Sequence, residues 1–386
     1  MPARVVLFGA TGYTGRLTAE AMVGRGLRPV LAGRNRERLR RLAADLGGEL
    51  ETAVADVSDP PSVRALVDRG DVLVTTVGPF VRWGEHAAAA ATTAGAHYLD
   101  STGEPPFIRE VFERYGPMAE GTGSGMLTAF GYDWVPGNLA AGIALRRAGD
   151  QAVRVDAGYF TTGRAEPSGG TTASMMGIVG APAFAYRDGR VRIERSAKHH
   201  RTFTVGSKRL DGVSVGASEH FTLPRIAPQL REVNVYLGWF GPASRAMQLA
   251  SGGLSVAMKL PGVEGLRRAA TERLVAGSSG GPDADARAQA GSHVVAIAYD
   301  NAGRELSEVH VAGVDGYTFT GRILAWGAAR AADGALRRTG ALGPIEAFGL
   351  DELTAGCAEA GISEQSAGGG KRAPAEGQPA EPSSLS

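Results

Sequence analysis

The chain has little of three things: cysteine, net charge and uninterrupted apolar sequence. Its one cysteine, Cys357, excludes an internal disulfide and a cysteine-based metal cluster, and it fits a reducing, cytoplasmic location. A formal net charge of +1 gives no electrostatic case for a nucleic-acid partner. The most apolar stretch, residues 236–260, is interrupted by Pro242 and Arg245, so we expect core helix and loop there and no membrane span.

The 386 residues are 43% hydrophobic and 21% charged, which is ordinary for a globular protein and enough for two domains with cores of their own. Up to residue 140, short apolar runs alternate with helical patterns. The expected strands are residues 4–10, 28–34, 51–57, 71–78, 97–103 and 126–133, and the expected helices are residues 15–26, 36–47, 60–70 and 85–96. This alternation predicts an α/β fold with a doubly wound, mostly parallel sheet.

From residue 151 the rhythm changes, because strand patterns such as "VRVDAGYFT" and "SHVVAIAYD" have no helix after each of them. They predict a second, α+β domain built on a mostly antiparallel sheet. Residues 320–338 and 349–362 are expected to be helices, and residues 275–291 a mobile loop. The tail from residue 363 has few apolar side chains to offset its ordering entropy, so we expect it to be disordered.

The stretch "VVLFGATGYTGRL", residues 5–17, places Gly9, Gly12 and Gly15 three apart directly after an apolar run. Such glycines permit a sharp turn, a close approach of the backbone to a pyrophosphate, and close packing of helix on strand. The first turn of the following helix then offers free N–H groups to phosphates. A plain glycine turn is the alternative, because the spacing alone is a weak signal.

The next strand end carries arginine where NAD-binding proteins carry an acid. In those proteins an acidic residue about 20 positions on holds the ribose 2′-hydroxyl, and the corresponding position here is Arg34. A guanidinium suits a 2′-phosphate, so the sequence predicts NADP(H) over NAD(H), with Arg36 and Arg38 as reinforcement. The alternative is that these arginines form the solvated face of a helix, with Glu37 and Arg41 an i,i+4 pair.

Two further strand ends are expected to line the same site. Asp56 and Val57 end the third strand, where a side chain can reach an adenine edge; the alternative for Asp56 is to cap the following turn. Gly78, Pro79 and Phe80 end the fourth strand, at the carboxyl edge where doubly wound sheets bind ligands.

The motifs "GATGYTG", "LAGRN", "VGPF", "HYLDSTGE" and "GYDWVP" follow one another in this order. Together they resemble the saccharopine dehydrogenase-like (saccharopine reductase) superfamily, and most closely its bacterial branch of trans-acting enoyl reductases. Later segments, among them "PSGGTTASM" at residues 167–175, are also similar to that branch, so the resemblance extends to residue 362.

The resemblance implies an NADP-binding Rossmann domain (1–140), a substrate and dimerisation domain (141–316), C-terminal helices that return to the Rossmann domain (317–362) and a tail (363–386). It implies that the phosphate loop consists of Gly9, Thr11, Gly12, Tyr13, Thr14 and Gly15. It further implies that Arg34 and Asn35 hold the 2′-phosphate end, and that Gly78, Pro79 and Phe80 approach the nicotinamide.

Two more family motifs fall on the presumed catalytic edge. The pattern "Y-x-D-x-x-G-E" falls on Tyr98, Asp100, Gly103 and Glu104. The pattern "G-[FY]-D-S-x-P-S-D" is altered: Tyr132 and Asp133 match, but Trp134 replaces a serine and "PGN" replaces "PSD". The departure touches the presumed substrate end, so the resemblance alone does not fix the substrate of this chain.

Several chemistries are excluded. No tyrosine is followed four residues later by lysine, as short-chain dehydrogenases require, and each of the four lysines stands too isolated for Schiff-base catalysis. No G-x-S-x-G elbow is present. His199 and His200, the closest histidine pair, lie side by side in a basic run, so we expect no metal site. What remains is hydride transfer with a nicotinamide cofactor.

The proton that accompanies a hydride needs a donor. Tyr132 and Asp133 are the expected donor or relay, because they follow the sixth strand near the crevice. The alternative for Asp133 is to brace the turn before Pro136. Glu104, Ser168 and Thr171 are the expected substrate contacts, and the alternative for each is to cap a helix.

Three functions remain open. The first is a stand-alone reductase of a C=C bond in a lipid or polyketide-like small molecule, carrier- or CoA-linked, as the resemblance implies. The second is a saccharopine-type reductase acting at a C–N bond, for which Arg164, Arg190, Arg192 and Arg195 are the candidates to bind an amino-dicarboxylate. The third is a non-catalytic NADP-binding regulatory protein. A homodimer is open in each case.

Overall fold

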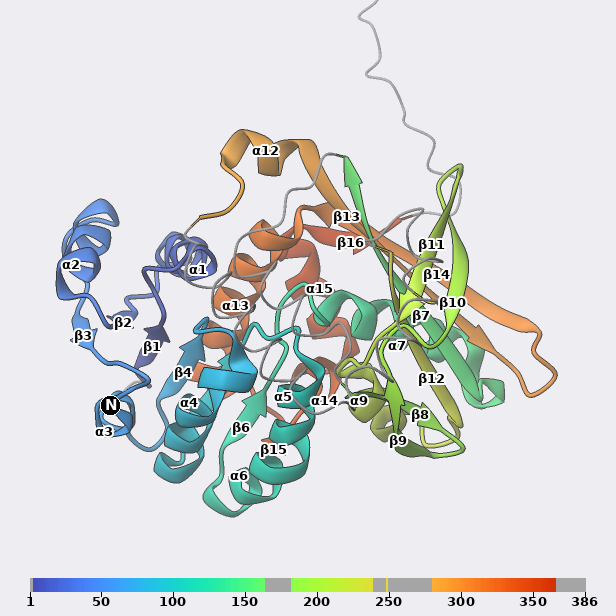
Figure 1. The fold of residues 1–386 in the computed structure, drawn as a ribbon, viewed down its shortest axis with the longest axis horizontal. Coiled ribbons are helices and arrows are strands. Elements are labelled where there is room, and N and C mark those ends of the chain that lie inside the picture. Colours follow the sequence, from blue (N-terminus) through green and yellow to red (C-terminus); the bar gives the residue numbers. More distant parts are fainter. Residues whose placement is uncertain (1–2, 164–181, 239–247, 249–279, 366–386) are drawn as a thin grey trace, which may run out of the picture.

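The structure is a computed structural model that describes residues 3–163, 182–238, 248 and 280–365. Within these residues, seven parallel strands form a first sheet in the order β15-β6-β5-β4-β1-β2-β3 (Figure 1). The strands are β1 (Val5–Phe8), β2 (Val30–Gly33), β3 (Thr52–Val54), β4 (Val72–Thr75), β5 (His97–Asp100), β6 (Gly125–Leu127) and β15 (Gly340–Ala341). The doubly wound parallel sheet is confirmed.

Helices connect these strands and cover the sheet. They are α1 (Tyr13–Gly24), α2 (Arg36–Asp45), α3 (Pro60–Arg64), α4 (Phe80–Ala94), α5 (Pro105–Glu110), α6 (Gly116–Thr122) and α7 (Val135–Ala148), with a π-helical segment η1 (Val111–Tyr115) between α5 and α6. β1, β2 and β4 are buried along their whole length. Parallel strands with helices on both faces need such continuous apolar sequence, which is why "VVLF" does not alternate.

The sixth strand is shorter than the sequence predicts. β6 ends at Leu127, and residues 128–134 form a loop. The cause is Asp100, whose Oδ1 accepts the N–H of Ala129 at 2.8 Å and whose Oδ2 accepts the Thr128 hydroxyl at 2.8 Å. These contacts and the positive φ of Ala129 (58°) turn the chain away from the ladder. The loop therefore carries Tyr132 and Asp133 across the carboxyl edge of the sheet.

The second sheet has nine described strands, in the order β10-β11-β12-β7-β13-β14-β16, with β8 beside β12 and β9 beside β8. The strands are β7 (Arg154–Gly163), β8 (Pro182–Arg187), β9 (Arg190–Arg195), β10 (His200–Val205), β11 (Lys208–Ser214), β12 (Glu232–Leu237), β13 (Ala290–Tyr299), β14 (Glu305–Val314) and β16 (Ile362–Glu364). Every pairing is antiparallel except β12 with β7. The mostly antiparallel second sheet is confirmed.

Among the described residues of this part of the chain there are three shorter helical elements: η2 (Gly149–Gln151), α9 (Glu219–Ile226) and α12 (Ala284–Gln289). The sequence predicts a mobile loop over residues 275–291; 275–279 lie outside the described residues, and α12 and the start of β13 correct the expectation for 284–291. The N-cap of α12 is Asp283, whose side chain accepts the N–H of Ala286 at 2.9 Å. A capped run of alanine, arginine and glutamine is helix-forming despite the glycines and the proline before it.

The C-terminal segment contributes to both sheets. It holds α13 (Gly316–Ala332), α14 (Pro344–Phe348) and α15 (Leu350–Ala360). β15 pairs with β6 in the first sheet, and β16 pairs with β14 in the second. The helix expected over 320–338 ends at Ala332, and Ser363 and Glu364, expected in the tail, belong to β16. The rest of the tail, 366–386, lies outside the described residues.

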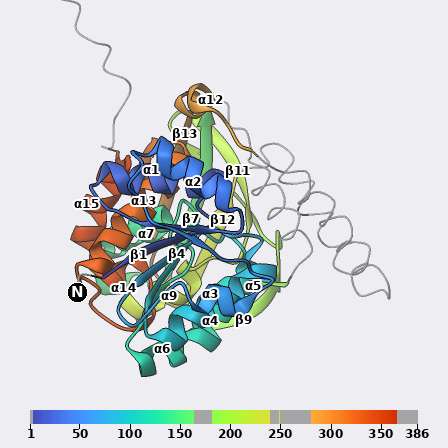
Figure 2. The same ribbon diagram turned by 90° about the vertical axis from the view of Figure 1, so that its left-hand side faces the viewer.

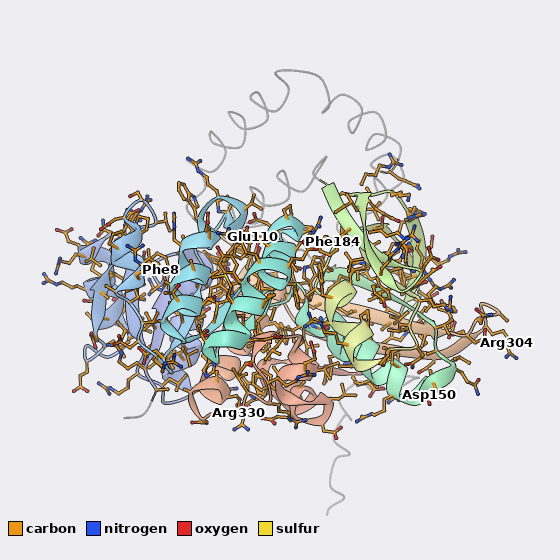
Figure 3. All side chains as sticks on the ribbon, turned by 90° about the horizontal axis from the view of Figure 1, so that it is seen from below. Phe8, Glu110, Asp150, Phe184, Arg304 and Arg330 are labelled. Atoms are coloured by element: carbon orange, nitrogen blue, oxygen red, sulfur yellow. The ribbon has the colours of Figure 1, made fainter. Side chains whose placement is uncertain are left out.

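Helix α13 lies against α1, side by side in two views (Figures 1 and 2). The approach is close because residue 321 is glycine: a Cβ there would lie 3.0 Å from the backbone carbonyl of Leu17. One large apolar cluster runs from the first sheet through α7 and α13 to the inner face of the second sheet. The molecule is elongated, with Phe8 toward one end and Arg304 and Asp150 toward the other (Figure 3). Among the described residues, no helix is long and apolar enough to cross a bilayer.

Candidate active site

The three glycines of the first loop have different structural roles. Gly9 has φ +91°, a conformation that favours glycine, and its N–H donates to Ala32 O at 2.9 Å. A Cβ on Gly15 would lie 2.1 Å from the carbonyl oxygen of Gly9, so α1 can pack on the turn only with glycine there. A Cβ on Gly12 would meet only that same oxygen, at 3.3 Å. The fold requires Gly9 and Gly15, whereas glycine at position 12 leaves space above the loop.

The space lies at the N-terminus of α1, a place suited to phosphate. Gly12 is the N-cap of α1 and has no side chain to satisfy the N–H groups of the first turn. Tyr13, Thr14 and Gly15 begin this helix, and Thr11 lies in the loop before it. Free N–H groups and the positive end of the helix dipole favour an anion. We call this space above Gly12, at the N-terminus of α1, the phosphate cradle, and it fits a dinucleotide pyrophosphate.

Arg34 follows β2 and is exposed. Within the described residues it makes no ion pair, and its charge contributes to lowering the pKa of Asp56. Asn35 has a structural role, since it is the N-cap of α2 and its side chain accepts the N–H of Arg38 at 2.9 Å. The expected pair of Glu37 with Arg41 is present at 3.9 Å. Arg34 therefore remains available for a 2′-phosphate, and Arg36 and Arg38, expected to reinforce it, are exposed on α2.

Asp56 has the turn role that was the alternative to adenine binding. Its Oδ1 accepts both the N–H and the hydroxyl of Ser58, at 2.9 and 2.8 Å, and these bonds hold its pKa below the usual range. Val57 follows it in the same turn and is half-buried. Contact of either residue with an adenine remains a prediction.

Glu104 joins two of the predicted site segments. Its Oε1 accepts the N–H of Phe80 at 2.9 Å, and its Oε2 accepts the N–H of Val81 at 3.0 Å. It stands at the N-cap position of α5 without a side-chain cap there, and its carboxylate binds the first turn of α4 instead. The side chain is buried. The structure therefore gives Glu104 the task of holding the Gly78–Pro79–Phe80 loop, and its contact with substrate remains a prediction.

Neighbouring contacts connect the glycine loop to Asp133. Thr76, after β4, donates its hydroxyl to Gly9 O at 3.3 Å. Gly103 precedes Glu104, and a Cβ on Gly103 would lie 2.8 Å from Oδ2 of Asp133. The ends of β1, β4, β5 and β6 thus form one continuous edge, with the phosphate loop at one side and Asp133 at the other.

Tyr132 and Asp133 have different environments. The Tyr132 hydroxyl donates to Phe160 O at 3.1 Å, its N–H donates to Thr320 Oγ1 at 3.0 Å, and burial raises the pKa of its phenol. Oδ1 of Asp133 is sealed from solvent and has no hydrogen-bond partner within the described residues. Burial raises the pKa of Asp133 to about 7. Tyr132 is fixed in place, and Asp133 is the carboxyl group with an unused oxygen.

Asp100 also lies at this edge, but its bonds are saturated. Besides Thr128 and Ala129, it accepts the N–H of Thr102 at 2.9 Å. Burial raises its pKa to about 6 against the opposing effect of these bonds. It therefore acts as a brace between the loops after β5 and β6.

A buried polar network beside Asp133 was missed by sequence reasoning. The Tyr159 hydroxyl lies 2.6 Å from Oε1 of Glu219, accepts the N–H of Gly137 at 2.7 Å, and lies 3.0 Å from Trp134 O. Asn138 joins it by donating to Trp134 O at 2.9 Å. Burial raises the pKa of Glu219 to about 8, and the charge of Asp133 adds to the rise.

The signal for this network was the altered motif itself. Trp134 is buried and packs edge-on against Tyr159, with ring centroids 5.0 Å apart. A Cβ on Gly137 would lie 2.1 Å from the Tyr159 hydroxyl. Trp134, Gly137 and Asn138, which lie where "DWVPGN" departs from the expected pattern, make these contacts.

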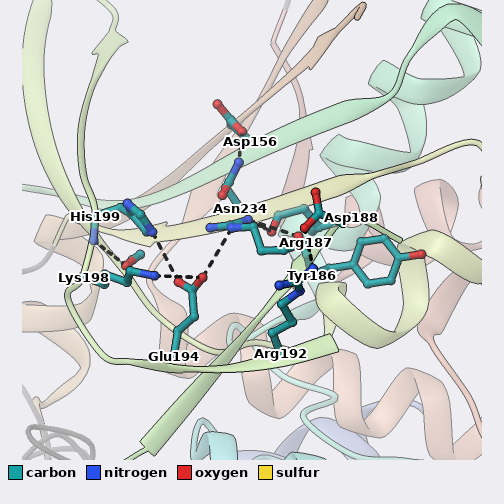
Figure 4. Close-up of polar contacts among 11 residues, drawn as sticks. Asp156, Tyr186, Arg187, Asp188, Arg192, Glu194, Lys198, His199 and Asn234 are labelled. Carbon is teal, nitrogen blue, oxygen red and sulfur yellow. Dashed lines mark hydrogen bonds and ion pairs between the residues drawn. The ribbon is translucent and has the colours of Figure 1, made fainter. Parts of the chain in front are cut away.

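The remaining candidates lie away from the edge or outside the described residues. Ser168, Thr171 and Arg164 belong to the undescribed residues. Arg190 and Arg192 are exposed on β9, and Arg192 pairs with Asp188 (Figure 4). On the same hairpin the Glu194 carboxylate is held by Arg187 at 3.6 Å, Lys198 at 3.2 Å and His199 at 3.3 Å.

In the described part of the chain, no group of three histidine, cysteine or acidic side chains could hold a metal ion.

Comparison with known proteins agrees with the site. Residues 5–122 match the family described as the saccharopine dehydrogenase NADP binding domain. A protein of Mycobacterium leprae named trans-acting enoyl reductase is 41% identical over 140 residues, which are 35% of this chain and 34% of that protein. A Mycobacterium tuberculosis protein, provisionally given the same name, is 37% identical over 190 residues, 45% of this chain and 44% of its own length. The match thus spans less than half of these curated relatives.

A solved structure shares the fold over nearly the whole chain. It is the apo saccharopine dehydrogenase (L-Glu forming) of Saccharomyces cerevisiae, with a TM-score of 0.57 and 13% identity, covering 94% of this chain and 99% of that one. At 13% identity, this likeness shows that the two proteins share a fold. Residues 5–122 match the saccharopine dehydrogenase NADP binding domain, and this match indicates that the chain binds NADP(H), as the sequence motifs predicted.

Proposed function

We propose that the protein is an NADPH-dependent reductase of an enoyl-type C=C bond in a lipid or polyketide-like substrate, carried as a thioester on CoA or a carrier. The names of the curated relatives support this assignment, at 37% and 41% identity over part of the chain. The proposal includes a cytoplasmic location, because the reaction consumes NADPH.

The cofactor is held by the residues that its chemistry requires. The N–H groups of the first turn of α1 bind the pyrophosphate, and Arg34 binds the 2′-phosphate. Glu104 fixes the Gly78–Pro79–Phe80 loop that lies beside the nicotinamide. When bound, NADPH supplies a hydride to the β-carbon of the enoyl group.

The observation that carries the proposal is Asp133. Reduction of an enoyl thioester adds a proton at the α-carbon, so the site needs an acid that is protonated near neutral pH. A carboxyl with pKa about 7 and one oxygen without a partner meets that need. Asp133 therefore donates the proton. Tyr132, whose hydroxyl is committed to Phe160 O, positions the loop that holds Asp133.

The arginines offer no support for a C–N reaction on an amino-dicarboxylate. Such a substrate has two carboxylates to bind at the crevice. Of the candidates that the structure describes, Arg190 and Arg192 are exposed on the edge strand β9, and Arg195 lies on the same strand.

The test is NADPH oxidation with enoyl thioesters, cyclic imines, and keto acids plus an amine. We expect turnover with an enoyl thioester, and a saturated thioester as product by mass spectrometry. Turnover confined to imines or keto acids would replace the proposal with C–N chemistry. Tight NADPH binding without turnover on any of them would favour a regulatory protein.

A further inference from the structure

The phosphate loop is covered by a segment that follows it by about 270 residues in the chain. The Tyr13 hydroxyl donates to Pro282 O at 2.5 Å, and Nη1 of Arg287 donates to the Tyr13 hydroxyl at 3.1 Å and to Pro282 O at 3.0 Å. Residue 281 is glycine, and a Cβ there would lie 2.6 Å from the Tyr13 ring. In both ribbon views α12, which carries Arg287, lies above α1, and in Figure 1 the segment that leads into α12 runs down toward α1 (Figures 1 and 2).

The side chain of Tyr13 is also held from the other side. Its ring packs edge-on against Tyr317 at the start of α13, with centroids 5.2 Å apart. Asp315 fixes that start by accepting the N–H groups of Tyr317 and Thr318 at 2.9 and 3.1 Å. Since Tyr13 is the first residue of α1, these contacts fix the position of Arg287 relative to the anion-binding end of the helix.

Arg287 has binding capacity that the protein does not use. Its side chain is half-buried, and within the described residues it has no carboxylate partner. The nearby acids are occupied or exposed: Asp283 caps α12, Asp285 is exposed, and Asp315 caps α13. Of the five N–H donors of a guanidinium, the structure assigns partners only to Nη1. A half-buried cation with unused donors beside the phosphate loop can bind an anion there.

We propose that Arg287 is a pyrophosphate ligand of NADP(H), delivered to the phosphate loop by α12 and positioned by Tyr13. The guanidinium fork matches phosphate oxygens and adds a charge from the second half of the chain to the N–H groups of α1. The cofactor is then clamped between two segments. The inference rests on NADP(H) binding and does not depend on which bond is reduced.

The test measures binding, without turnover. NADPH affinity follows from the fluorescence of the bound nicotinamide, and adenosine 2′-monophosphate, which has no pyrophosphate, is the second ligand, measured by competition. We expect Arg287→Ala to lower the affinity for NADPH about tenfold or more and to leave the affinity for adenosine 2′-monophosphate unchanged. Arg287→Lys keeps the charge but lacks the guanidinium fork, so its NADPH affinity should lie between those of the unmodified protein and Arg287→Ala.

Two further variants separate a ligand from a structural latch. Tyr13→Phe removes the contact with Arg287 but leaves the guanidinium, so it should cost NADPH affinity clearly less than Arg287→Ala. Arg304→Ala is the matched control, because Arg304 is exposed and paired with Asp300 at 2.7 Å far from the loop (Figure 3).

Equal losses in Arg287→Ala and Tyr13→Phe, unchanged NADPH affinity in Arg287→Ala, or equal weakening of both ligands would overturn the proposal. Thermal unfolding accompanies each titration. If Arg287→Ala fails to fold, the affinities of Arg287→Lys for NADPH and adenosine 2′-monophosphate are compared in its place.

Discussion

The carboxylate of Glu104 accepts the N–H of Phe80 at 2.9 Å and, with its second oxygen, that of Val81 at 3.0 Å. One buried side chain thus completes the N-terminus of α4 and fixes the loop that leads into it. The N-cap of α4 is Pro79, which has no side-chain donor or acceptor, so Glu104 supplies the cap from the next strand end.

Glu104→Gln should destabilise the protein by about 2 kcal/mol, because an amide has one acceptor oxygen for two N–H groups and the other is left buried without a partner. Urea unfolding followed by circular dichroism measures the loss. Glu110→Gln is the control: Glu110 pairs with Arg114 at the surface, where such a pair contributes little to stability. Equal losses of stability in the two variants would contradict the capping role of Glu104.

The glycines at positions 12 and 15 should separate binding from folding. Gly15→Ala places a Cβ 2.1 Å from a backbone oxygen and should cost about 2 kcal/mol or more of stability. Gly12→Ala meets only a 3.3 Å contact and should fold, but its methyl occupies the space for the pyrophosphate. We expect Gly12→Ala to lose NADPH affinity at near-native melting temperature. Normal NADPH affinity in Gly12→Ala would contradict binding of the pyrophosphate in the phosphate cradle.

Arg34→Ala should lower the affinity for NADPH by about tenfold to a hundredfold and leave the affinity for NADH unchanged, since only NADPH carries the 2′-phosphate. Arg34→Asp should reverse the preference. Fluorescence titration with both cofactors decides it. Arg41→Ala is the matched control and should change neither affinity, because Arg41 is an exposed arginine on the following helix α2 and pairs with Glu37.

Asp133→Asn should lower kcat about a hundredfold or more and leave NADPH affinity unchanged, because the proton donor is removed and the cofactor loop is not. In the unmodified protein, kcat should fall as pH rises through about 7, where the carboxyl loses its proton. Asp150→Asn, at the far end of the molecule, is the control. A pH profile that keeps this fall in Asp133→Asn would assign the proton to another group.

Stability should also depend on pH through Glu219. Its pKa rises from 4.5 to about 8 on folding, so the folded state binds a proton more tightly than the unfolded state. This contribution is fully present below pH 4.5 and is lost as pH rises through about 8. Glu219→Gln keeps an acceptor for Tyr159 and cannot ionise. Its melting temperature should therefore decline less between pH 5 and 9; parallel curves would mean that Glu219 is ionised in the fold.

Local features of the sequence predicted much of the fold and the phosphate end of the site. Strand–helix alternation depends on apolar runs, and the loop depends on glycines whose spacing is visible. Arg34 follows a strand, so its place was predictable from the chain alone. The same local reasoning overlooked α12, although Asp283 before "ADARAQ" is a capping signal.

The proton-donating end depends on contacts between distant residues. Tyr159 and Glu219 are 60 positions apart, and Glu104 and Phe80 are 24 apart. Neither pair has a pattern that marks it before the fold brings it together. Tyr132 and Asp133 are adjacent in sequence, and only burial and hydrogen bonding distinguish the committed hydroxyl from the carboxyl with an unused oxygen.

The place of β15 has a consequence for biosynthesis. Its two residues, Gly340 and Ala341, pair with β6 and form the outer strand of the cofactor-binding sheet, and α13 lies against α1. A ribosome that has released the first six strands has therefore not yet made the pieces that complete this sheet and its cover. The nascent chain must hold an unfinished nucleotide fold, with the β6 edge open, until nearly the whole second sheet has been translated.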